Sequence, residues 1–258
     1  MYLKYTYVHK IRILVSGLQA LLKHKDIWRA EDIAEIAAYQ RRTNLPTGFT
    51  ALDHLLYGNG WPRDGLVEIL PEVHGCGELQ LLIPGLCRLM GEETRWISWV
   101  NPPFVPYAPA LNAHDIDVNR VFLVHPKNHR EALWATEKIL ESGSCSAMLV
   151  WLDEQQLEEK QLRRIQTRAK EGRAWITIFR PMHAQVKSSP AELRLSLRLA
   201  EAHIKDQVKL SILKRKGGWP VPNLSLQLHE YRVLSANTRI AAQWQQWRQQ
   251  HSPAGAKH

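Results

Sequence analysis

Two glycines stand between a run of apolar residues and a helical pattern in residues 70–80, which read LPEVHGCGELQ. The preceding GLVEIL predicts a strand, and the following ELQLLIPGLCRLM predicts a helix. A strand, a glycine-containing turn and a helix are the parts of a phosphate-binding loop, because the free N–H groups at a helix N-terminus attract anions. Nucleotide binding is therefore the first function to test against the residues of this segment.

The residue types in this loop argue against a working nucleotide site. Such a loop needs a lysine for the β- and γ-phosphates and a Ser or Thr hydroxyl for magnesium. Here Cys76 stands at the lysine position, Gly77 at the hydroxyl position, and Glu78 places a carboxylate where the phosphate would lie. We expect Gly75 and Gly77 to keep the turn tight. The four residues Gly75, Cys76, Gly77 and Glu78 thus form a degenerate nucleotide loop that serves as scaffold, and we expect no cofactor.

The elements around this loop alternate between strands and helices. Short apolar strands separated by helices are typical of a parallel sheet with crossover connections. Three later segments, ELRLSLRLAE, QVKLSILKRK and LSLQLHEYR, follow without helices, and the first two alternate apolar and charged residues as half-exposed antiparallel strands do. The predicted strands are 66–71, 95–100, 121–125, 147–152 and 174–179, and the predicted helices are 78–90, 107–113, 130–142 and 156–171.

The 258 residues divide into three predicted parts. Residues 1–43 form an N-terminal helical arm and linker, residues 44–234 the core, and residues 235–258 a C-terminal tail. No apolar run is long enough to span a membrane, and the start lacks a secretory cleavage pattern, so we expect a cytoplasmic protein without membrane contact. The three cysteines lie far apart without a CxxC pair, which predicts free thiols and no metal site.

Residues 45–82, which begin LPTGFTALDHLLYGNGWPRDGLVEIL, resemble the start of a RecA-type core. The resemblance continues through TRWISWVNPP and AMLVWLDE, and it covers residues 45–230. It implies a RecA-like P-loop-type core, with a mainly parallel sheet flanked by helices and ending in antiparallel strands. Asn101 stands where RecA relatives carry the water-activating glutamate, and Trp151 stands where they carry the Walker B aspartate. These lost catalytic positions imply that the protein is not an enzyme.

Two phrases, RWISWVNPPFVPYAPAL and REALWATEKILESGSCSAMLVWL, are similar to ImuA, a RecA-like family of bacterial translesion-synthesis cassettes. This resemblance implies a non-catalytic accessory factor in SOS-induced DNA repair by translesion synthesis. Its partners would be ImuB and, through it, a DnaE-type error-prone polymerase, with RecA or single-stranded DNA as further candidates. The middle of the chain also resembles SulA, the SOS inhibitor of cell division, which gives an alternative function, binding of FtsZ. The resemblance to ImuA is preferred because it also accounts for the upstream LPTGFTALDHLL and the downstream hairpin, which the shorter SulA lacks. A residual nucleotide-binding switch is a third hypothesis.

The formal net charge of +9 favours an anionic or acidic partner. The basic residues before Trp219 would suit single-stranded DNA, although an ordinary charged turn has the same composition. The segment 179–194 takes the place of a DNA-binding loop in RecA relatives. The two tail tryptophans lie i, i+3 apart, and they either dock a partner or pack on the core. The predicted DNA or partner contacts are Arg180, Lys187, Lys214, Arg215, Lys216, Trp219, Trp244 and Trp247.

Overall fold

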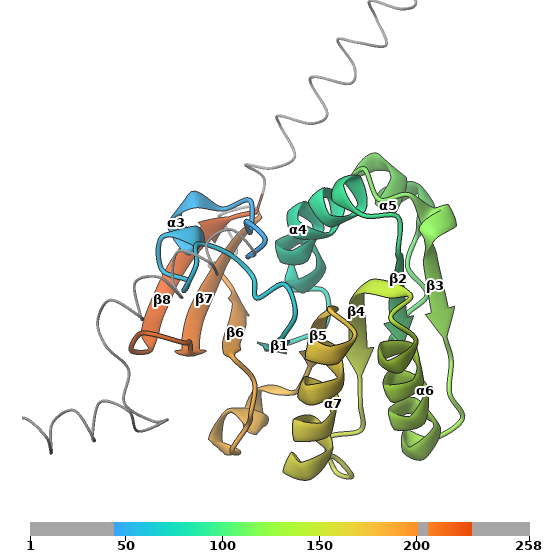
Figure 1. Ribbon diagram of the computed structural model, residues 1–258. Coiled ribbons are helices and arrows are strands. Elements are labelled where there is room, and N and C mark those ends of the chain that lie inside the picture. Colours follow the sequence, from blue (N-terminus) through green and yellow to red (C-terminus); the bar gives the residue numbers. More distant parts are fainter. Residues whose placement is uncertain (1–43, 201–205, 229–258) are drawn as a thin grey trace, which may run out of the picture. The chain divides into compact units, whose positions relative to one another are not determined.

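The computed structural model describes residues 44–200 and 206–228 (Figure 1). The chain divides into two compact units, residues 1–42 and 43–258, and all described residues belong to the second. The predicted N-terminal arm, the predicted tail, and Trp244 and Trp247 within it lie outside the described residues. The three-part division therefore stays a prediction.

The described residues form one eight-stranded sheet with the order β3-β2-β4-β5-β1-β6-β7-β8. Neighbouring strands from β3 to β6 run parallel, whereas β7 is antiparallel to both β6 and β8, so the sheet is mixed. The strands are β1 (Leu66–Pro71), β2 (Trp96–Val100), β3 (Val121–Val124), β4 (Cys145–Trp151), β5 (Trp175–Phe179), β6 (Leu193–Leu199), β7 (Gln207–Lys214) and β8 (Val221–Gln227).

Three helices among the described residues run beyond two turns, namely α4 (Glu78–Glu92), α6 (His129–Ser142) and α7 (Glu159–Glu171). α6 begins where the Asn128 side chain accepts the backbone N–H of Glu131, and it ends at Gly143, which has a positive φ of 62°. The shorter elements are α3 (Thr50–Asp53), α5 (Ala108–Ala113), η1 (Val118–Arg120) and η2 (Met182–Val186).

Apolar side chains fill both faces of the sheet. One cluster joins α4 to Trp61 and Trp175, whose rings stack with centroids 5.5 Å apart, and the other joins α6 and α7 to the strands. Gly85 of α4 lies against the two indoles, so that a Cβ there would approach each of them to 3.1 Å. Because protein interiors are close-packed, this position needs a residue without a side chain.

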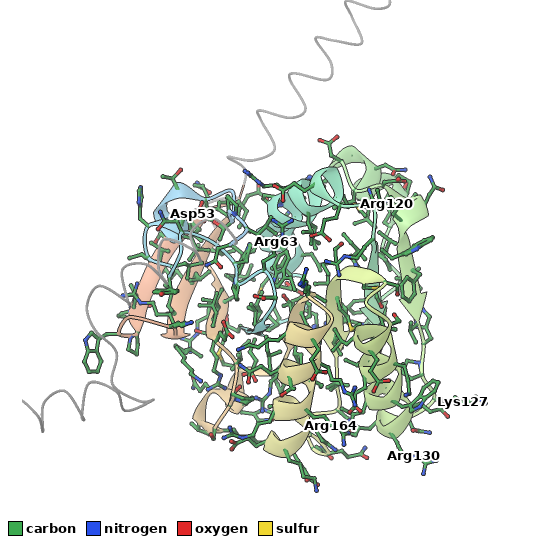
Figure 2. The ribbon with its side chains drawn as sticks, viewed as in Figure 1. Asp53, Arg63, Arg120, Lys127, Arg130 and Arg164 are labelled. Carbon is green, nitrogen blue, oxygen red and sulfur yellow. The ribbon has the colours of Figure 1, made fainter. Side chains whose placement is uncertain are left out.

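Arg63 and Arg120, both labelled in Figure 2, bond to the ends of neighbouring helices and strands. The guanidinium of Arg120 donates to the backbone carbonyls of Met90 and Arg95, and it thereby joins the start of β3 to the end of α4 and the start of β2. Arg63 forms ion pairs with the last glutamates of α4. Near the start of the described residues, the Asp53 side chain accepts the backbone N–H of Thr47 and closes the turn before α3.

The fold class expected from the sequence, a RecA-like P-loop-type core with a mainly parallel sheet flanked by helices, is wrong. The structure is a mixed sheet with few helices, and three of its eight strands belong to the antiparallel ladder β6-β7-β8. The prediction failed because alternating strands and helices and a glycine turn occur in many α/β folds. Those signals locate elements along the chain, but they do not decide which of these folds the elements form.

Candidate functional site: an aromatic pocket at the strand ends

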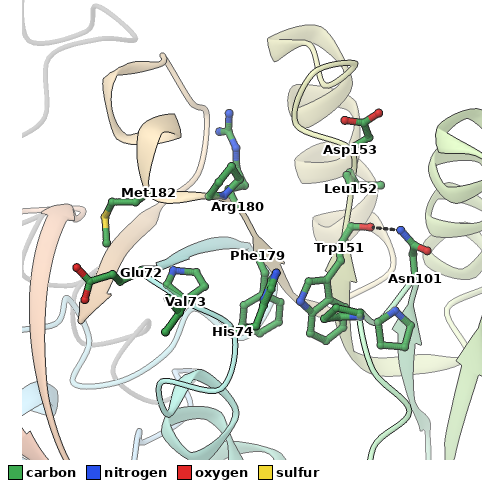
Figure 3. Close-up of a pocket in the computed structure, with 14 residues that line it drawn as sticks. Glu72, Val73, His74, Asn101, Trp151, Leu152, Asp153, Phe179, Arg180 and Met182 are labelled. Atoms are coloured by element: carbon green, nitrogen blue, oxygen red, sulfur yellow. Dashed lines mark hydrogen bonds between the residues drawn. The ribbon is translucent and has the colours of Figure 1, made fainter. Parts of the chain in front are cut away.

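A pocket of about 520 Å³ lies at the carboxyl ends of β1, β2, β4 and β5 (Figure 3). This edge is where open α/β sheets place their ligands, because the loops that follow parallel strands meet there. Four prolines and the rings of Trp151 and Phe179 lie among its lining residues, and Glu72, His74, Asn101 and Asp153 supply polar groups. The pocket is therefore a binding site of mixed chemistry rather than a purely apolar cavity.

Two stacked aromatic rings form part of the pocket wall. Trp151 at the end of β4 stacks on Phe179 at the end of β5 with centroids 4.5 Å apart, and Trp99 of β2 contacts the same indole at 6.1 Å. Trp151 is only 8 % exposed, and its Nε1–H has no hydrogen-bond partner among the described residues. A buried indole N–H without an acceptor is unfavourable, and this nitrogen has almost no surface that a ligand could reach.

Asn101 fixes the loop on the β2 side of the pocket. Its Nδ2 donates to the backbone carbonyl of Trp151 at 3.1 Å, and its backbone N–H donates to the carbonyl of Val124 at 2.8 Å. Its φ of 56° lies in the left-handed region, which asparagine tolerates better than most residues. The structure thus brings together the two predicted lost catalytic positions, Asn101 and Trp151, and gives both a role in shaping the pocket.

Exposed apolar side chains stand on the two loops that border the pocket, after β1 and after β2, and these loops are called its mouth. Val73 follows β1, and Phe104, Val105 and Tyr107 follow β2, with exposures of 51–74 %. The loops touch where the His74 ring meets the Phe104 ring edge-on at 6.4 Å. The sequence reasoning missed these residues and Phe179. The run PPFVPY, with three apolar or aromatic residues among prolines directly after a strand, was the signal that could have located the mouth.

In the glycine loop next to this pocket, a side chain bonds to the backbone of the same loop. The Glu78 carboxylate accepts the backbone N–H of Gly75 at 2.7 Å, so it takes the place of an anion at the start of α4. Burial, together with the Glu78 charge, raises the pKa of the Cys76 thiol to about 11. At Gly77, whose φ is 106°, a Cβ would come within 2.4 Å of the Leu228 side chain. No part of the loop offers a cation to a phosphate.

A buried charge cluster lies behind the pocket. The Arg180 guanidinium, 3 % exposed, donates to both oxygens of Glu154 at 2.8 Å and to Glu68 Oε1 at 2.9 Å. Glu68 of β1 also accepts from Arg194 at 2.7 Å, and Lys187 pairs with Glu154 at 2.8 Å. Burial alone would raise the pKa of Glu154, but the hydrogen bonds from Arg180 and Lys187 outweigh it and lower that pKa. Arg180 and Lys187 are therefore already bound to carboxylates of this chain.

Four further predicted contacts lie within the described residues, at the turn between β7 and β8, and none of these four lines the pocket. Arg215 donates to the backbone carbonyls of Trp219 and Leu55, and the Lys216 ammonium lies 5.2 Å from the centroid of the Tyr57 ring. Lys214 donates to the carbonyl of Ser189 at 2.9 Å. Trp219 is 86 % exposed. These residues form a turn that is bonded to neighbouring loops and carries one projecting indole.

Within residues 44–200 and 206–228, no group of His, Cys, Asp and Glu side chains is arranged to hold a metal ion. In the same part of the chain, no helix has the length and apolar character needed to cross a membrane. The mixed sheet, the self-closed loop and the aromatic pocket with its exposed apolar mouth define a class of protein that acts by binding.

Comparison with known proteins identifies the family. Residues 67–176 match the family described as "Cell division inhibitor SulA". SulA of Edwardsiella piscicida is 30 % identical over 128 residues, which are 50 % of this chain and 75 % of that protein. SulA of Yersinia enterocolitica is 27 % identical over 144 residues, which are 56 % and 76 % of the two chains. The crystal structure of SulA from Pseudomonas aeruginosa superposes with a TM-score of 0.38 at 24 % identity, over 45 % of this chain and 97 % of that one. The chain belongs to the SulA family.

The family assignment corrects several expectations. The similarity to ImuA, the role in translesion synthesis and DNA repair, and the partners ImuB, a DnaE-type polymerase, RecA and single-stranded DNA are wrong. The matched residues 67–176 contain the phrases that had resembled both families, and residues 45–66 and the β7–β8 hairpin, which had favoured ImuA, lie outside the match. The relatives are inhibitors rather than catalysts, and the protein is not an enzyme.

Proposed function

We propose that this protein is a SulA-like inhibitor of cell division that acts in the SOS response by binding the division GTPase FtsZ in the cytoplasm. The observation that carries the proposal is the 30 % identity with the E. piscicida cell division inhibitor over three quarters of that protein. A protein that acts by binding needs an accessible, specific surface rather than a catalytic group. The pocket mouth and its apolar side chains supply such a surface.

The features of the site suit a protein that inhibits its target by binding to it. Phe104 and Tyr107 are more than 70 % exposed, and aromatic side chains of this kind are frequent anchors in protein interfaces. Prolines 102, 103, 106 and 109 restrict the backbone that carries them. A restricted loop loses less conformational entropy on binding, so a larger part of the contact energy appears as affinity.

The test is a titration of purified FtsZ with the purified chain. Polymer formation, measured by sedimentation, and GTP hydrolysis should fall in proportion to the chain added and should stop near equimolar amounts. Inhibition well below equimolar amounts would indicate an enzyme, and no inhibition at a severalfold excess would refute the proposal. Tubulin, another polymerising GTPase, provides the control and should be unaffected. Expression of the chain in dividing bacteria should produce filaments.

A further inference from the structure

The antiparallel ladder of β6, β7 and β8 carries a strongly basic surface that the proposed function does not use. The ladder begins at residue 193, beyond the residues 67–176 that match the family, and none of its residues lines the pocket. Its described residues, 193–200 and 206–228, contain six Lys or Arg and a single Asp. Because the whole chain has a net charge of +9, this short part of it supplies more than half of the excess positive charge.

The two faces of the ladder, whose strands lie side by side in Figure 1, differ in chemistry. Apolar side chains such as Leu197 and Leu210 are buried in the cluster that includes α4. The cluster beneath α6 and α7 contains no side chain of β6, β7 or β8 within the described part of the chain. The opposite face, called here the basic face, consists of Arg194, Ser196 and Arg198 of β6, Lys209, Ser211 and Lys214 of β7, and Ser225 and Gln227 of β8.

Two cross-strand pairs on the basic face join like charges. The register places Arg198 opposite Lys209 and Arg194 opposite Lys214. Opposed side chains in an antiparallel ladder have Cβ atoms only about 5 Å apart, and like charges at this distance destabilise the sheet. Glu68 neutralises Arg194, but Arg198 is exposed and forms no hydrogen bond or ion pair with another described residue. Burial and the charge of Arg194 also lower the pKa of Lys214. A local conflict of this kind, kept at a cost in stability, is typical of a functional site.

The chemistry of the basic face selects an anionic and hydrophilic ligand. Hydroxyl and amide groups from Ser211, Ser225 and Gln227 lie among the cations, and no residue of the basic face is aromatic. Single-stranded nucleic acid gains much of its affinity from bases that stack on aromatic side chains, and a membrane surface gains it from apolar side chains that enter the lipid. Carboxylates need only cations and hydrogen-bond donors, and this face supplies both. An acidic segment of protein therefore fits it best.

The spacing of the exposed cations matches an extended polypeptide. Lys209 and Lys214 lie five residues apart on one strand, which corresponds to about 16 Å. We propose that the basic face binds an extended acidic segment of another protein, whose Asp or Glu side chains pair with Arg198 and Lys209 at one end and with Lys214 at the other. The hydroxyls of Ser211 and Ser225 donate hydrogen bonds to the oxygens of the segment between these ends.

A fluorescent peptide of alternating Asp and Ser, about ten residues long so that it spans the face, tests the proposal. Fluorescence anisotropy with the full chain should show saturable binding of this peptide and no binding of the same peptide with Asn in place of Asp. Arg198→Glu and Lys209→Glu should each lower the affinity by at least about tenfold, because each brings like charges together. Arg130→Glu makes the same change of net charge at an exposed position on α6, and it should lower the affinity by less than about twofold, because salt screens distant charges.

The melting temperature separates loss of binding from loss of the fold. Arg198→Glu replaces a like-charge pair by an ion pair with Lys209, so this variant should melt at the same temperature as the unaltered chain or higher. A lower melting temperature would show that Arg198 serves the fold instead, and it would overturn the proposal. Binding of the Asn peptide, or equal affinity of the Arg198→Glu and Lys209→Glu variants, would overturn it as well. A deoxythymidine oligonucleotide that binds more tightly than the acidic peptide, and loses affinity in Trp219→Ala, would assign the surface to nucleic acid and refute the acidic segment.

Discussion

The side-chain amide of Asn101 donates a hydrogen bond of 3.1 Å to the backbone carbonyl of Trp151, and it links the carboxyl ends of β2 and β4 (Figure 3). The same residue turns the chain into the proline-rich loop through its positive φ. One asparagine thereby sets both the direction of the loop and its distance from the aromatic wall. We therefore expect the shape of the pocket to depend on this contact.

The variant Asn101→Asp tests this dependence. Aspartate tolerates the left-handed backbone, but it cannot donate, and its carboxylate would face the carbonyl oxygen of Trp151. We expect a loss of about 1–3 kcal/mol in the free energy of unfolding, measured by urea denaturation, and weaker binding to FtsZ. Asn119→Asp is the matched control, since Asn119 lies in η1 away from the pocket, and it should leave binding unchanged. An unaltered affinity for Asn101→Asp would show that the loop does not need this bond.

The buried charge cluster should dominate the stability of the region behind the pocket. Glu68→Gln removes the carboxylate that both Arg180 and Arg194 share, and it leaves two buried guanidinium groups with fewer partners. We expect a loss of about 3–5 kcal/mol in urea unfolding. Glu159→Gln breaks the exposed pair with Arg163 and should cost less than about 1 kcal/mol. Similar losses for the two variants would contradict the importance of burial here.

Glu154 should make stability depend on pH. Burial alone would raise the pKa of Glu154, but Arg180 and Lys187 lower it below the ordinary 4.5. The folded protein therefore binds this proton less readily than the unfolded chain. Its contribution to stability is complete above pH 4.5 and is lost as the pH falls through the lower folded pKa. Urea unfolding between pH 7 and pH 3 should show a steeper loss for the unaltered chain than for Glu154→Gln. The exposed Glu171→Gln should keep the steep profile.

The cysteines should differ in reactivity. Burial raises the pKa of Cys145 to about 11, and burial with the Glu78 charge does the same for Cys76. At pH 8 a thiol with that pKa is about 0.1 % thiolate, and the thiolate is the reactive form. Cys87 is only partly buried. Iodoacetamide should therefore label Cys87 first in the folded protein, as peptide mass spectrometry can show. In guanidinium chloride all three should react at similar rates; fast labelling of Cys76 without denaturant would mean that the loop opens.

Magnesium and ATP should leave the melting temperature unchanged, because the Glu78 carboxylate already occupies the N–H of Gly75. Glu78→Ala should lower the melting temperature by roughly 2–4 °C, since one buried hydrogen bond is lost in a chain of this size. It should still not bind ATP, because the loop contains no Lys or Arg. A saturable rise of the melting temperature with ATP in either protein would refute this interpretation of the loop.

The positions of strands β1 to β5 could be predicted from the sequence, because these are short, mostly apolar runs bounded by turn residues. The expected 66–71 and 174–179 correspond to β1 and β5 almost residue for residue. The pocket could not be predicted, since Trp151 and Phe179 stack only through the parallel register of β4 and β5. Arg180 looked like a contact for an outside anion because its partner Glu68 lies 112 residues away. The preference for ImuA was wrong because the middle of the chain resembles both ImuA and SulA.

The bond between Glu78 and Gly75 has a consequence for control of the molecule. A carboxylate tethered three residues from its donor is present at a high effective concentration, and a freely diffusing phosphate would have to displace it against negative charge. We therefore expect the loop to keep one stable state instead of two. This corner of the fold holds the same shape whatever the level of nucleotide in its surroundings, and it works as a fixed support for the neighbouring pocket rather than as a sensor.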